Sequence, residues 1–379
     1  MKEKIKKNVF VLGFASLLTD ISSEMIFAIL PVFMSSVLLL DKTAIGLIEG
    51  LGESSASMSK LVSARVQKIF GSKKRLVIFG YSLSTIVKPL FAFASTWWQI
   101  LFIRAFDRAG KGLRGPPRDA IIADSTDQKT QGFYFGFHRT MDSIGAVIGP
   151  LIAFFLLSIF EKNFNIIFLF SFIPAFFAVL LIFFFVKEEQ KSLHAKEEKK
   201  EFDKNKYNWF LLCSIIFAIG NRSVSFLLIR IQELGLSIAL VPLAYLLFNA
   251  SYALFSIPFG KLSDKIGPKK ALSIAFLTFS VSFAGFSLVE NTALAILLLS
   301  LHGFAVAGIE TTQRVIAAQT VSQEKRTSGF GTYQGITGIL LLPASLTTGA
   351  LWSIFGAPAA FAFSALTSIT AAILISRLK

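Results

Sequence analysis

Apolar segments of about 20 residues recur along nearly the whole of this chain. The hydrocarbon core of a bilayer is about 30 Å thick, so an α-helix needs about 20 residues to cross it. Apolar residues make up 54% of the sequence and charged residues 16%, whereas a soluble chain would carry amphipathic stripes and more surface charge. An outer-membrane barrel would show shorter, alternating segments. The sequence therefore predicts an all-α integral membrane protein with many spans.

Twelve apolar segments can be drawn. They lie at 8–39, 44–69, 75–96, 97–124, 133–158, 164–186, 208–235, 239–262, 269–290, 292–318, 327–353 and 356–376. Lysines precede the first segment, but it carries Asp20 and Glu24 and lacks a clear cleavage site, which favours an uncleaved first helix over a signal peptide. Alternate loops, at 65–75, 187–207 and 261–270, are basic. By the positive-inside rule these loops and both termini lie in the cytoplasm.

The stretch 187–207 is interpreted as a linker, because its charges are mixed and it has no apolar period. It divides the chain into an N-terminal bundle, 1–186, and a C-terminal bundle, 208–379, of six segments each. The halves resemble each other, since ARVQKIFG at 64–71 corresponds in position to GKLSDKIG at 260–267. Such repeats are typical of transporters whose solute site lies between two halves near the bilayer midplane.

The loop GKLSDKIGPKK at 260–270 resembles a motif of the major facilitator superfamily, G-x-x-x-D-R/K-x-G-x-R/K-R/K, which follows the second helix of a half. Its fitting residues include Gly260, Asp264, Lys265 and Gly267, which the resemblance implies form a gating loop. In the first half Gly71 fits, whereas Ala64 and Lys68 stand where the motif has its first glycine and its acid. The resemblance thus predicts a weaker acid-mediated latch in the first half.

Two more stretches are similar to helix motifs of that family. RAFDRAGKG at 104–112 is similar to its fourth-helix motif, and GAVIGP at 145–150 to the fifth-helix motif of proton-coupled exporters, although the later glycines of that motif are missing. The matching residues are Arg104, Gly110, Gly112, Gly145, Gly149 and Pro150. The glycines permit close helix packing.

The resemblance covers nearly the whole chain and carries implications for fold and function. It implies two pseudo-symmetric six-helix bundles, twelve transmembrane helices and transport by alternating access. Helices one and four of each half would line a central cavity. The stretches DISSE at 20–24, GPPRDA at 115–120 and FGFHRTMD at 135–142 also resemble a bacterial subfamily. This resemblance implies a monomer in the bacterial cytoplasmic membrane that contacts lipid, a small solute and protons.

The segment 97–124 is unusually charged for a membrane helix. It carries Arg104, Asp107, Arg108, Lys111, Arg114 and Arg118. One charge at the bilayer centre costs about 2.5–3.5 kcal/mol on insertion scales, so these side chains are expected to face protein or water. We interpret Arg104, Arg108 and Lys111 as solute-binding candidates, with Arg114 and Arg118 extending toward the cytoplasmic surface. The alternative is a structural stripe in which Asp107 pairs with Arg104 or Lys111.

Acidic residues on the first helix are candidates for proton coupling. Asp20 and Glu24 are four residues apart and share a helical face. Counting the helical rise places Glu24 at about the depth of Lys111. Either acid could load a proton, and a permanent carboxylate–arginine pair is the alternative. On the second helix Glu49 and Glu53 are expected to be solvated, and Lys88 on the third is expected to be structural.

The fifth and seventh segments add further candidates. His138 and Asp142 are four residues apart, so they could pair, and a histidine there could change protonation in the physiological range. A buried structural histidine is the alternative. Arg222 is the solute-binding candidate of the second half. Glu310 and Arg314 form a possible pair within one helix.

Other chemistries are poorly supported. A Walker A loop requires G-x-x-x-x-G-K-[ST] after a strand, whereas Gly112 follows Lys111 and no strand is predicted before it. The single cysteine, Cys213, permits neither a disulfide framework nor a cysteine metal site. The sequence shows no His/Glu metal-ligand spacing and no nucleophile elbow. Its basic residues lie mainly in the loops between apolar segments, where membrane topology accounts for them better than nucleic-acid binding does. We therefore predict no enzyme, no cofactor, no metal and no nucleic-acid partner.

These patterns predict a secondary transporter for a small anionic or zwitterionic solute. An exporter of cationic drugs would more naturally have an acidic cavity, whereas the interior stripe here is basic. Proton coupling is expected. A drug or metabolite exporter working by proton antiport and a siderophore-type importer are the alternatives. A passive channel or a membrane receptor fits the internal repeat and the loop motif less well.

Overall fold

The computed structural model describes residues 2–40, 42–160, 163–187, 203–221, 224–237 and 240–377. Over these ranges the regular elements are α-helices and short 3-10 helices. Most of the linker expected at 187–207 lies outside the described residues, and so does Arg222.

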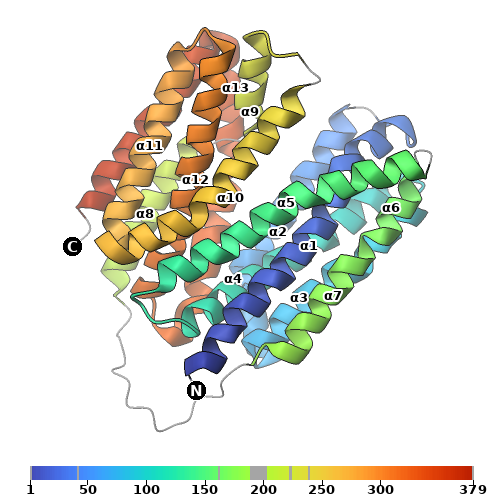
Figure 1. Cartoon of the computed structure of the whole chain (residues 1–379), viewed down its shortest axis with the longest axis horizontal. Coiled ribbons are helices and arrows are strands. Elements are labelled where there is room, and N and C mark those ends of the chain that lie inside the picture. Colours follow the sequence, from blue (N-terminus) through green and yellow to red (C-terminus); the bar gives the residue numbers. More distant parts are fainter. Residues whose placement is uncertain are drawn as a thin grey trace. The chain divides into compact units, whose positions relative to one another are not determined.

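Figure 1 shows the helices in chain order. The first part of the chain forms α1 (Lys2–Ser36), α2 (Lys42–Phe70), α3 (Lys73–Val87), η1 (Lys88–Phe93), α4 (Trp97–Asp124), α5 (Gln131–Ile159), α6 (Phe164–Phe170) and α7 (Phe172–Phe185). It continues with α8 (Lys204–Gly220), α9 (Ser225–Glu233), α10 (Val241–Ile266), α11 (Pro268–Leu288), α12 (Thr292–Thr320), η3 (Gln323–Lys325) and α13 (Arg326–Ser376).

Membrane-length apolar helices dominate this order. Within the described ranges, 9 helical segments are long and apolar enough to cross a bilayer, so the chain is an all-α, multi-pass membrane protein as predicted. The charged helices α2 and α4 are outside that set, although they have 29 and 28 residues. In α13 the backbone leaves helical geometry at Gly356, with φ 82°. Twelve spans would require α2, α4 and both parts of α13 to cross, and this count stays a prediction.

The chain clusters into two compact units. The first comprises residues 1–126, 141–200 and 322–335, and the second comprises 127–140, 201–321 and 336–379. The helices α5 and α13 are therefore each divided between the units, at residues 140 and 335. The division predicted from the sequence, with bundles at 1–186 and 208–379, stays a prediction.

In the first unit, α4 packs against α2 and α3, and α1 packs against α7 (Figure 1). The charged helix thus lies among helices of its own unit. The apolar core at the other end of α1 includes Ile29 and Phe33, and the Phe33 ring meets that of Phe168 edge-on with centroids 5.2 Å apart. The first unit therefore contains an apolar core in addition to its charged helix.

Glycines set the spacing of α4. A methyl group on Gly110 would lie 2.7 Å from the carbonyl oxygen of Gly80 on α3, and one on Gly112 would collide with the Ala56 carbonyl on α2. Contacts this close admit only a glycine without backbone movement. The charged face of α4 is therefore brought within side-chain reach of both neighbours.

In the second unit, α10 and α11 pack on α12. Rings of Phe279 and Phe283 flank His302, each with centroids 5.2 Å away. Gly267 joins α10 to α11 with φ 88°, and Gly71 joins α2 to α3 with φ 68°. This left-handed conformation disfavours side chains with a Cβ, which explains the glycine at the same place in both loop motifs.

Candidate solute and proton site

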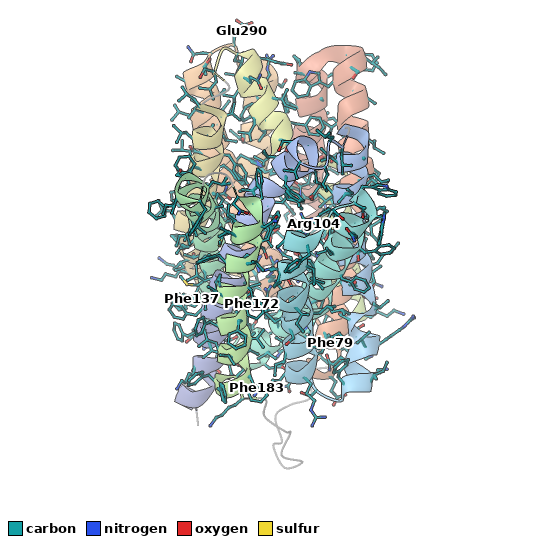
Figure 2. The ribbon with its side chains drawn as sticks, turned by 90° about the vertical axis from the view of Figure 1, so that its right-hand side faces the viewer. Phe79, Arg104, Phe137, Phe172, Phe183 and Glu290 are labelled. Carbon is teal, nitrogen blue, oxygen red and sulfur yellow. The ribbon has the colours of Figure 1, made fainter. Side chains whose placement is uncertain are left out.

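The cationic side chains of α4 are mostly buried inside the first unit. Arg104 and Arg114 are 2% exposed, and Arg108 and Arg118 are 9% exposed. Figure 2 shows Arg104 well inside the ribbon, away from Phe183 near the end of α7. The charges therefore face protein, as the cost of placing them in lipid demands.

Two carboxylates of α2 meet two arginines of α4. Arg104 Nη2 lies 2.7 Å from Glu49 Oε2, and Arg108 Nη2 lies 3.2 Å from Glu53 Oε1. The Glu49 side chain is 25% exposed and that of Glu53 is 60% exposed. Glu53 is thus exposed as expected and Glu49 only in part, and each acid in addition pairs with an arginine on the neighbouring helix.

Asp107 lies on the opposite side of this network. Its carboxylate accepts a hydrogen bond from Ser84 of α3 and lies 3.7 Å from Arg104 Nη1. The predicted pairing of Asp107 with Arg104 is present, in addition to the shorter Arg104–Glu49 pair. Arg104 therefore bridges α2 and the α3 side of α4.

Lys88 occupies the junction of α3 and η1 and is fully buried. Its ammonium donates to Ser22 Oγ at 2.8 Å and to Ser23 Oγ at 3.0 Å, and its Nζ lies 3.5 Å from the Thr19 carbonyl oxygen. An ammonium has three donors, so oxygens of α1 satisfy all three. Lys88 consequently ties α1 to the break in α3.

Arg114 differs from its neighbours because it forms no ion pair with any described residue. Its guanidinium stacks over the Tyr81 ring, 4.2 Å from the centroid. The Nε and Nη1 atoms are buried without a hydrogen-bond partner. The expectation that Arg114 extends to the surface was wrong, since the small helix spacing at Gly80 encloses it. A buried cation without a direct ion pair is costly, which makes Arg114 a candidate for holding an anion.

Arg118 is also turned inward rather than to the surface. It donates from Nη2 to Asp119 Oδ1 at 2.9 Å, and from Nε to the same oxygen at 3.0 Å. Asp119 Oδ2 accepts a hydrogen bond from Gln334 of α13 at 2.6 Å. Arg118 is thereby held in a polar network that joins α4 to the start of α13.

Lys111 and the acids of α1 form a looser group. Lys111 Nζ lies 3.9 Å from Asp20 Oδ1, and the Lys111 side chain is 42% exposed. Glu24 lies within electrostatic range of Lys111 and of Asp20, and Asp20 also interacts electrostatically with Asp142 of α5. One accessible ammonium thus lies near three carboxylates, a grouping that can exchange a proton or a bound anion.

The helix α5 crosses α1 at these acids. A methyl group on Gly145 would lie 3.0 Å from Asp20 Cβ, and one on Gly149 would lie 2.7 Å from Glu24 Cβ. Pro150 follows inside the same helix. The two glycines therefore let α5 approach α1 closely at the positions that bear the carboxylates.

His138 belongs to the second unit, whereas Asp20 and Glu24 belong to the first. It is 1% exposed, and its Nδ1 lies 3.2 Å from Arg139 Nη2. Arg139 Nη1 lies 3.7 Å from Glu310 Oε2, which is also 2.7 Å from Arg314 Nη1. The predicted pair of Glu310 with Arg314 is therefore present and extends to α5.

The gating-loop residues surround the start of α5. Asp264 accepts hydrogen bonds from the backbone N–H groups of Gly132 and Phe133, each at 2.8 Å. A methyl group on Gly260 would collide with the Gly132 carbonyl. Lys265 is exposed, and Gly267 forms the turn. The motif thus supplies an N-terminal cap to α5 at a close helix crossing.

The first half has a different ionic contact where its motif lacks an acid. Asp124, at the end of α4, lies 2.5 Å from Lys73 Nζ and also pairs with Arg326 at the start of α13. No sequence pattern predicted the contacts of Asp124 with Lys73 and Arg326, or that of Asp119 with Gln334. Each is a common charged or polar residue near a helix end, and only the folded chain shows that they meet.

The described residues contain no group of three or more His, Cys, Asp or Glu side chains that could hold a metal ion. The acids near Lys111 are instead interleaved with cations. The chemistry that this arrangement supports is reversible protonation and ion pairing.

Membrane-length helices enclosing paired charges define a membrane transporter, since charged groups inside the bilayer are placed for solute or ion passage. The sequence profile of the Major Facilitator Superfamily matches residues 12–229 and 210–379. The chain belongs to this family.

Relatives and solved structures agree with that assignment. An MFS-type transporter of Methanocaldococcus jannaschii is 34% identical over 360 residues, covering 93% of this chain and 90% of that protein. The multidrug resistance protein MdtG of Proteus mirabilis is 27% identical over 285 residues, covering 70% and 69%. The fold resembles the fucose:proton symporter FucP of E. coli, with TM-score 0.79, 14% identity and 98% of each chain covered. It also resembles the human organic anion transporter MFSD10, with TM-score 0.80, 14% identity and coverage of 98% and 99%.

Proposed function

We propose that this chain is a secondary active transporter that moves a small anionic or zwitterionic solute by alternating access, coupled to protons. The observation that carries the proposal is the accessible ammonium of Lys111, loosely paired with Asp20 at 3.9 Å. A loosely held cation near several carboxylates is suited to exchanging its partner. The charged groups of Arg104 and Arg108 already have close partners on α2.

The coupling follows from charge balance. When Asp20 and Glu24 are ionised, they neutralise Lys111 and compete with an anionic solute for it. When one of them takes up a proton, the ammonium loses a counter-charge and the solute's anionic group can replace it. Proton and solute would then bind together, because each removes the cost of an unbalanced charge in a low-dielectric interior.

Arg114 would supply a second contact for the solute's anion. Its Nε and Nη1 atoms have no hydrogen-bond partner in the described chain, and a guanidinium fork matches a carboxylate or phosphate geometrically. Arg104 and Arg108 would complete the basic surface in a state where their glutamate pairs open. In the second half Arg222 remains the proposed contact, and Asp142 and His138 remain further proton-coupling candidates.

Helix crossings at small residues would provide the moving parts. The α1–α5 crossing lies at Gly145 and Gly149, next to the carboxylates. At the start of α5, Asp264 holds two backbone N–H groups. Protonation of a carboxylate at the α1–α5 crossing, together with release of the N–H groups held by Asp264, would shift the equilibrium of α5 between two positions. Alternating access requires such a movement.

Uptake into proteoliposomes tests this function. With an imposed pH gradient, accumulation of a suitable organic anion is expected, while solute exchange at equal pH persists without the gradient. Asp20→Asn and Glu24→Gln should lower gradient-driven accumulation at least about tenfold, the effect of losing about 1.4 kcal/mol, and retain exchange. Glu233→Gln, which removes an exposed acid paired with Arg230, is the matched control. Full proton dependence in both acid variants would exclude them as the coupling site.

We also infer the membrane arrangement. The basic loops support cytoplasmic termini in the cytoplasmic membrane of a bacterium, with twelve spans in bundles 1–186 and 208–379 joined by the linker 187–207. A monomer is sufficient for such a carrier. Labelling of single cysteines introduced into the loops, in place of Cys213, tests the orientation.

Export of a drug or metabolite by proton antiport is the second candidate. The relatives named multidrug resistance protein MdtG favour it, and so do the glutamates that neutralise Arg104 and Arg108. In that case protonation of the acids would release the exported compound instead of binding it. Uptake into inside-out vesicles that grows when the lumen is acidified would support this candidate and contradict anion–proton symport.

A further inference from the structure

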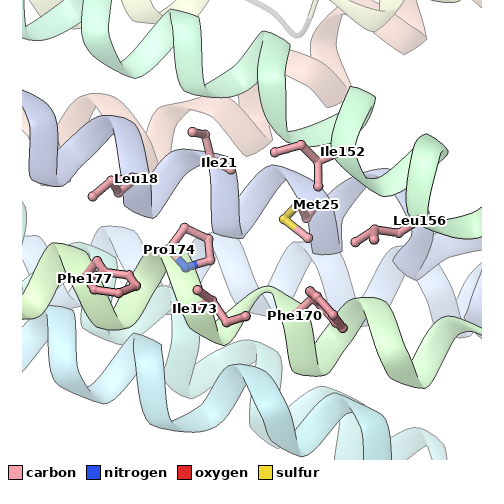
Figure 3. A pocket seen from close by; sticks show the side chains of 9 residues that line it. All are labelled: Leu18, Ile21, Met25, Ile152, Leu156, Phe170, Ile173, Pro174 and Phe177. Atoms are coloured by element: carbon pink, nitrogen blue, oxygen red, sulfur yellow. The ribbon is translucent and has the colours of Figure 1, made fainter.

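Two apolar cavities lie next to each other along α1. The first has a volume of about 380 Å³ and is lined by Lys7, Phe14, Leu18 and Phe185, among others. The second, also about 380 Å³, is lined by Leu18, Met25, Ile152 and Phe177, among others (Figure 3). Both touch Leu18, so together they follow one side of the helix. Figure 3 shows the second cavity between α1, α5 and the α6–α7 segment.

The length of the first cavity matches one leaflet of a membrane. Lys7 and Leu18 are eleven positions apart, which a helix spans in about 16 Å at 1.5 Å per residue. Half of the hydrocarbon core is about 15 Å. A chain that begins beside Lys7 would therefore reach Leu18 at about the bilayer midplane, where the second cavity opens.

The charge at its entrance is positive. The Lys7 ammonium lies over the Phe185 ring, 5.6 Å from the centroid, and forms no ion pair with the described residues. The stretch that ends at Lys7, KEKIKK at 2–7, carries four lysines and one glutamate, so its net charge is positive. Beyond Lys7, the lining of this cavity is apolar. One end thus suits an anionic group and the remainder suits a hydrocarbon chain.

We propose that this groove binds an anionic phospholipid of the leaflet that holds the N-terminal end of α1. The phosphate pairs with Lys7, one acyl chain fills the first cavity, and its end passes Leu18 into the second. A zwitterionic phospholipid fills the same cavity but lacks the net charge. The bound lipid contacts the helix that carries Asp20, two positions beyond Leu18. This binding does not depend on which solute is transported.

Fluorescence quenching by brominated lipids tests the site. Phe14 lines the first cavity and is 50% exposed, so Phe14→Trp places a reporter there with room for the larger ring. Its added signal is measured against the unsubstituted protein in bilayers of brominated phosphatidylglycerol or brominated phosphatidylcholine. The expected preference for phosphatidylglycerol is about fivefold, because one basic side chain near a membrane surface contributes about that much to attraction of anionic lipid.

A matched pair of lysine variants separates this site from general surface charge. Lys7→Gln should lower the preference to about one. Lys261→Gln should leave it unchanged, because Lys261 also lies over a phenylalanine ring, 5.8 Å from the Phe133 centroid, but on α10. Equal quenching by both lipids, or a preference that survives Lys7→Gln, would overturn the proposal. Stronger quenching by a brominated fatty acid than by either phospholipid would also overturn it.

Retained lipid gives a second measurement that needs no reporter. Protein purified in mild detergent from mixed bilayers should carry phosphatidylglycerol in excess over phosphatidylcholine by mass spectrometry. Lys7→Gln should remove the excess and Lys261→Gln should keep it. An unchanged lipid ratio in Lys7→Gln contradicts the site even where Phe14→Trp cannot be produced.

Discussion

Lys111 Nζ lies 3.9 Å from Asp20 Oδ1, whereas Arg104 Nη2 lies only 2.7 Å from Glu49 Oε2 in the same unit. The first pair joins α4 to α1 and the second joins α4 to α2. The shorter pair is a charge-assisted hydrogen bond, and the longer one is an electrostatic contact without hydrogen-bonding geometry. The two pairs therefore have different expected roles, one in solute exchange and one in holding helices together.

Lys111→Gln is expected to impair transport with little loss of stability. A partly exposed, long ion pair contributes at most about 1 kcal/mol, so the thermal midpoint in detergent should change little. The half-saturating concentration of an anionic solute should rise by about tenfold or more, equivalent to about 1.4 kcal/mol of lost binding. Uptake titrations and thermal unfolding of the same preparation check this. Unchanged affinity would remove Lys111 from the solute site.

Glu49→Gln is expected to destabilise the protein more than Glu53→Gln. Removing Glu49 leaves the 2%-exposed Arg104 without its shortest partner, and breaking a pair with one deeply buried member costs about 2 kcal/mol, below the range for wholly buried pairs. Glu53 is 60% exposed, so its loss should cost about 0–1 kcal/mol. Thermal unfolding in one detergent compares the variants. Equal midpoints would contradict a clamp between α2 and α4.

Arg114→Met is expected to raise stability while abolishing transport. The side chain is buried without an ion pair, so replacing it by an apolar group of similar length removes a desolvation cost of a few kcal/mol. The control is Arg104→Met, which leaves Glu49 and Asp107 without this cation and should lower the thermal midpoint. Stability and uptake are measured for both. Wild-type uptake by Arg114→Met would show that the guanidinium does not bind the solute.

Gly149→Ala is expected to disturb the contact of α5 with α1. Its new methyl would lie 2.6 Å from the Ile21 carbonyl oxygen, and relieving such overpacking costs about 1–3 kcal/mol. Gly50→Ala is the control, because a methyl there meets nothing within 4 Å and should stabilise α2 by up to about 1 kcal/mol. A midpoint for Gly149→Ala at or above that of Gly50→Ala would argue against a close crossing.

Asp264→Ala is expected to loosen the beginning of α5. The Gly132 and Phe133 N–H groups lose their acceptor, and loss of a capping side chain costs about 0.5–2 kcal/mol. Hydrogen exchange at these two amides should accelerate by about tenfold, since 1.4 kcal/mol equals a tenfold change in an opening equilibrium. Lys265→Ala, which removes the exposed neighbour, should leave exchange unchanged. Unaltered protection in Asp264→Ala would show that another group caps the helix.

Much of the fold could be predicted because membrane insertion depends on local composition. The segment drawn at 97–124 coincides with α4, and that drawn at 292–318 differs from α12 by two residues at its end. Breaks inside segments were harder to predict. The segment at 75–96 covers most of α3 and all of η1. Pro89 favours a bend there, but the bond of the Lys88 ammonium to α1 at this break could not be predicted.

The sequence was sufficient to predict which helical face carries the charges. It was not sufficient to predict which side chain each charge contacts. Periodicity placed Arg104, Arg108 and Lys111 together on one side of α4, where the structure has them. It gave no signal that Arg114 would stack on Tyr81 or that Arg118 would turn inward to Asp119. Partners are chosen by which helices pack together, and that information is not local.

By itself, the sequence determined that this chain spans a membrane as a helical transporter of its family and that its interior bears charge. Apolar length, basic loops and a loop motif suffice for this, because each acts through short-range chemistry. The tertiary structure alone decided which charges are neutralised. The small residues of α4 and α5 set the distances between helices. Those distances determine that Arg104 is paired, that Lys111 is loosely held, and that Arg114 forms no direct ion pair within the described part of the chain.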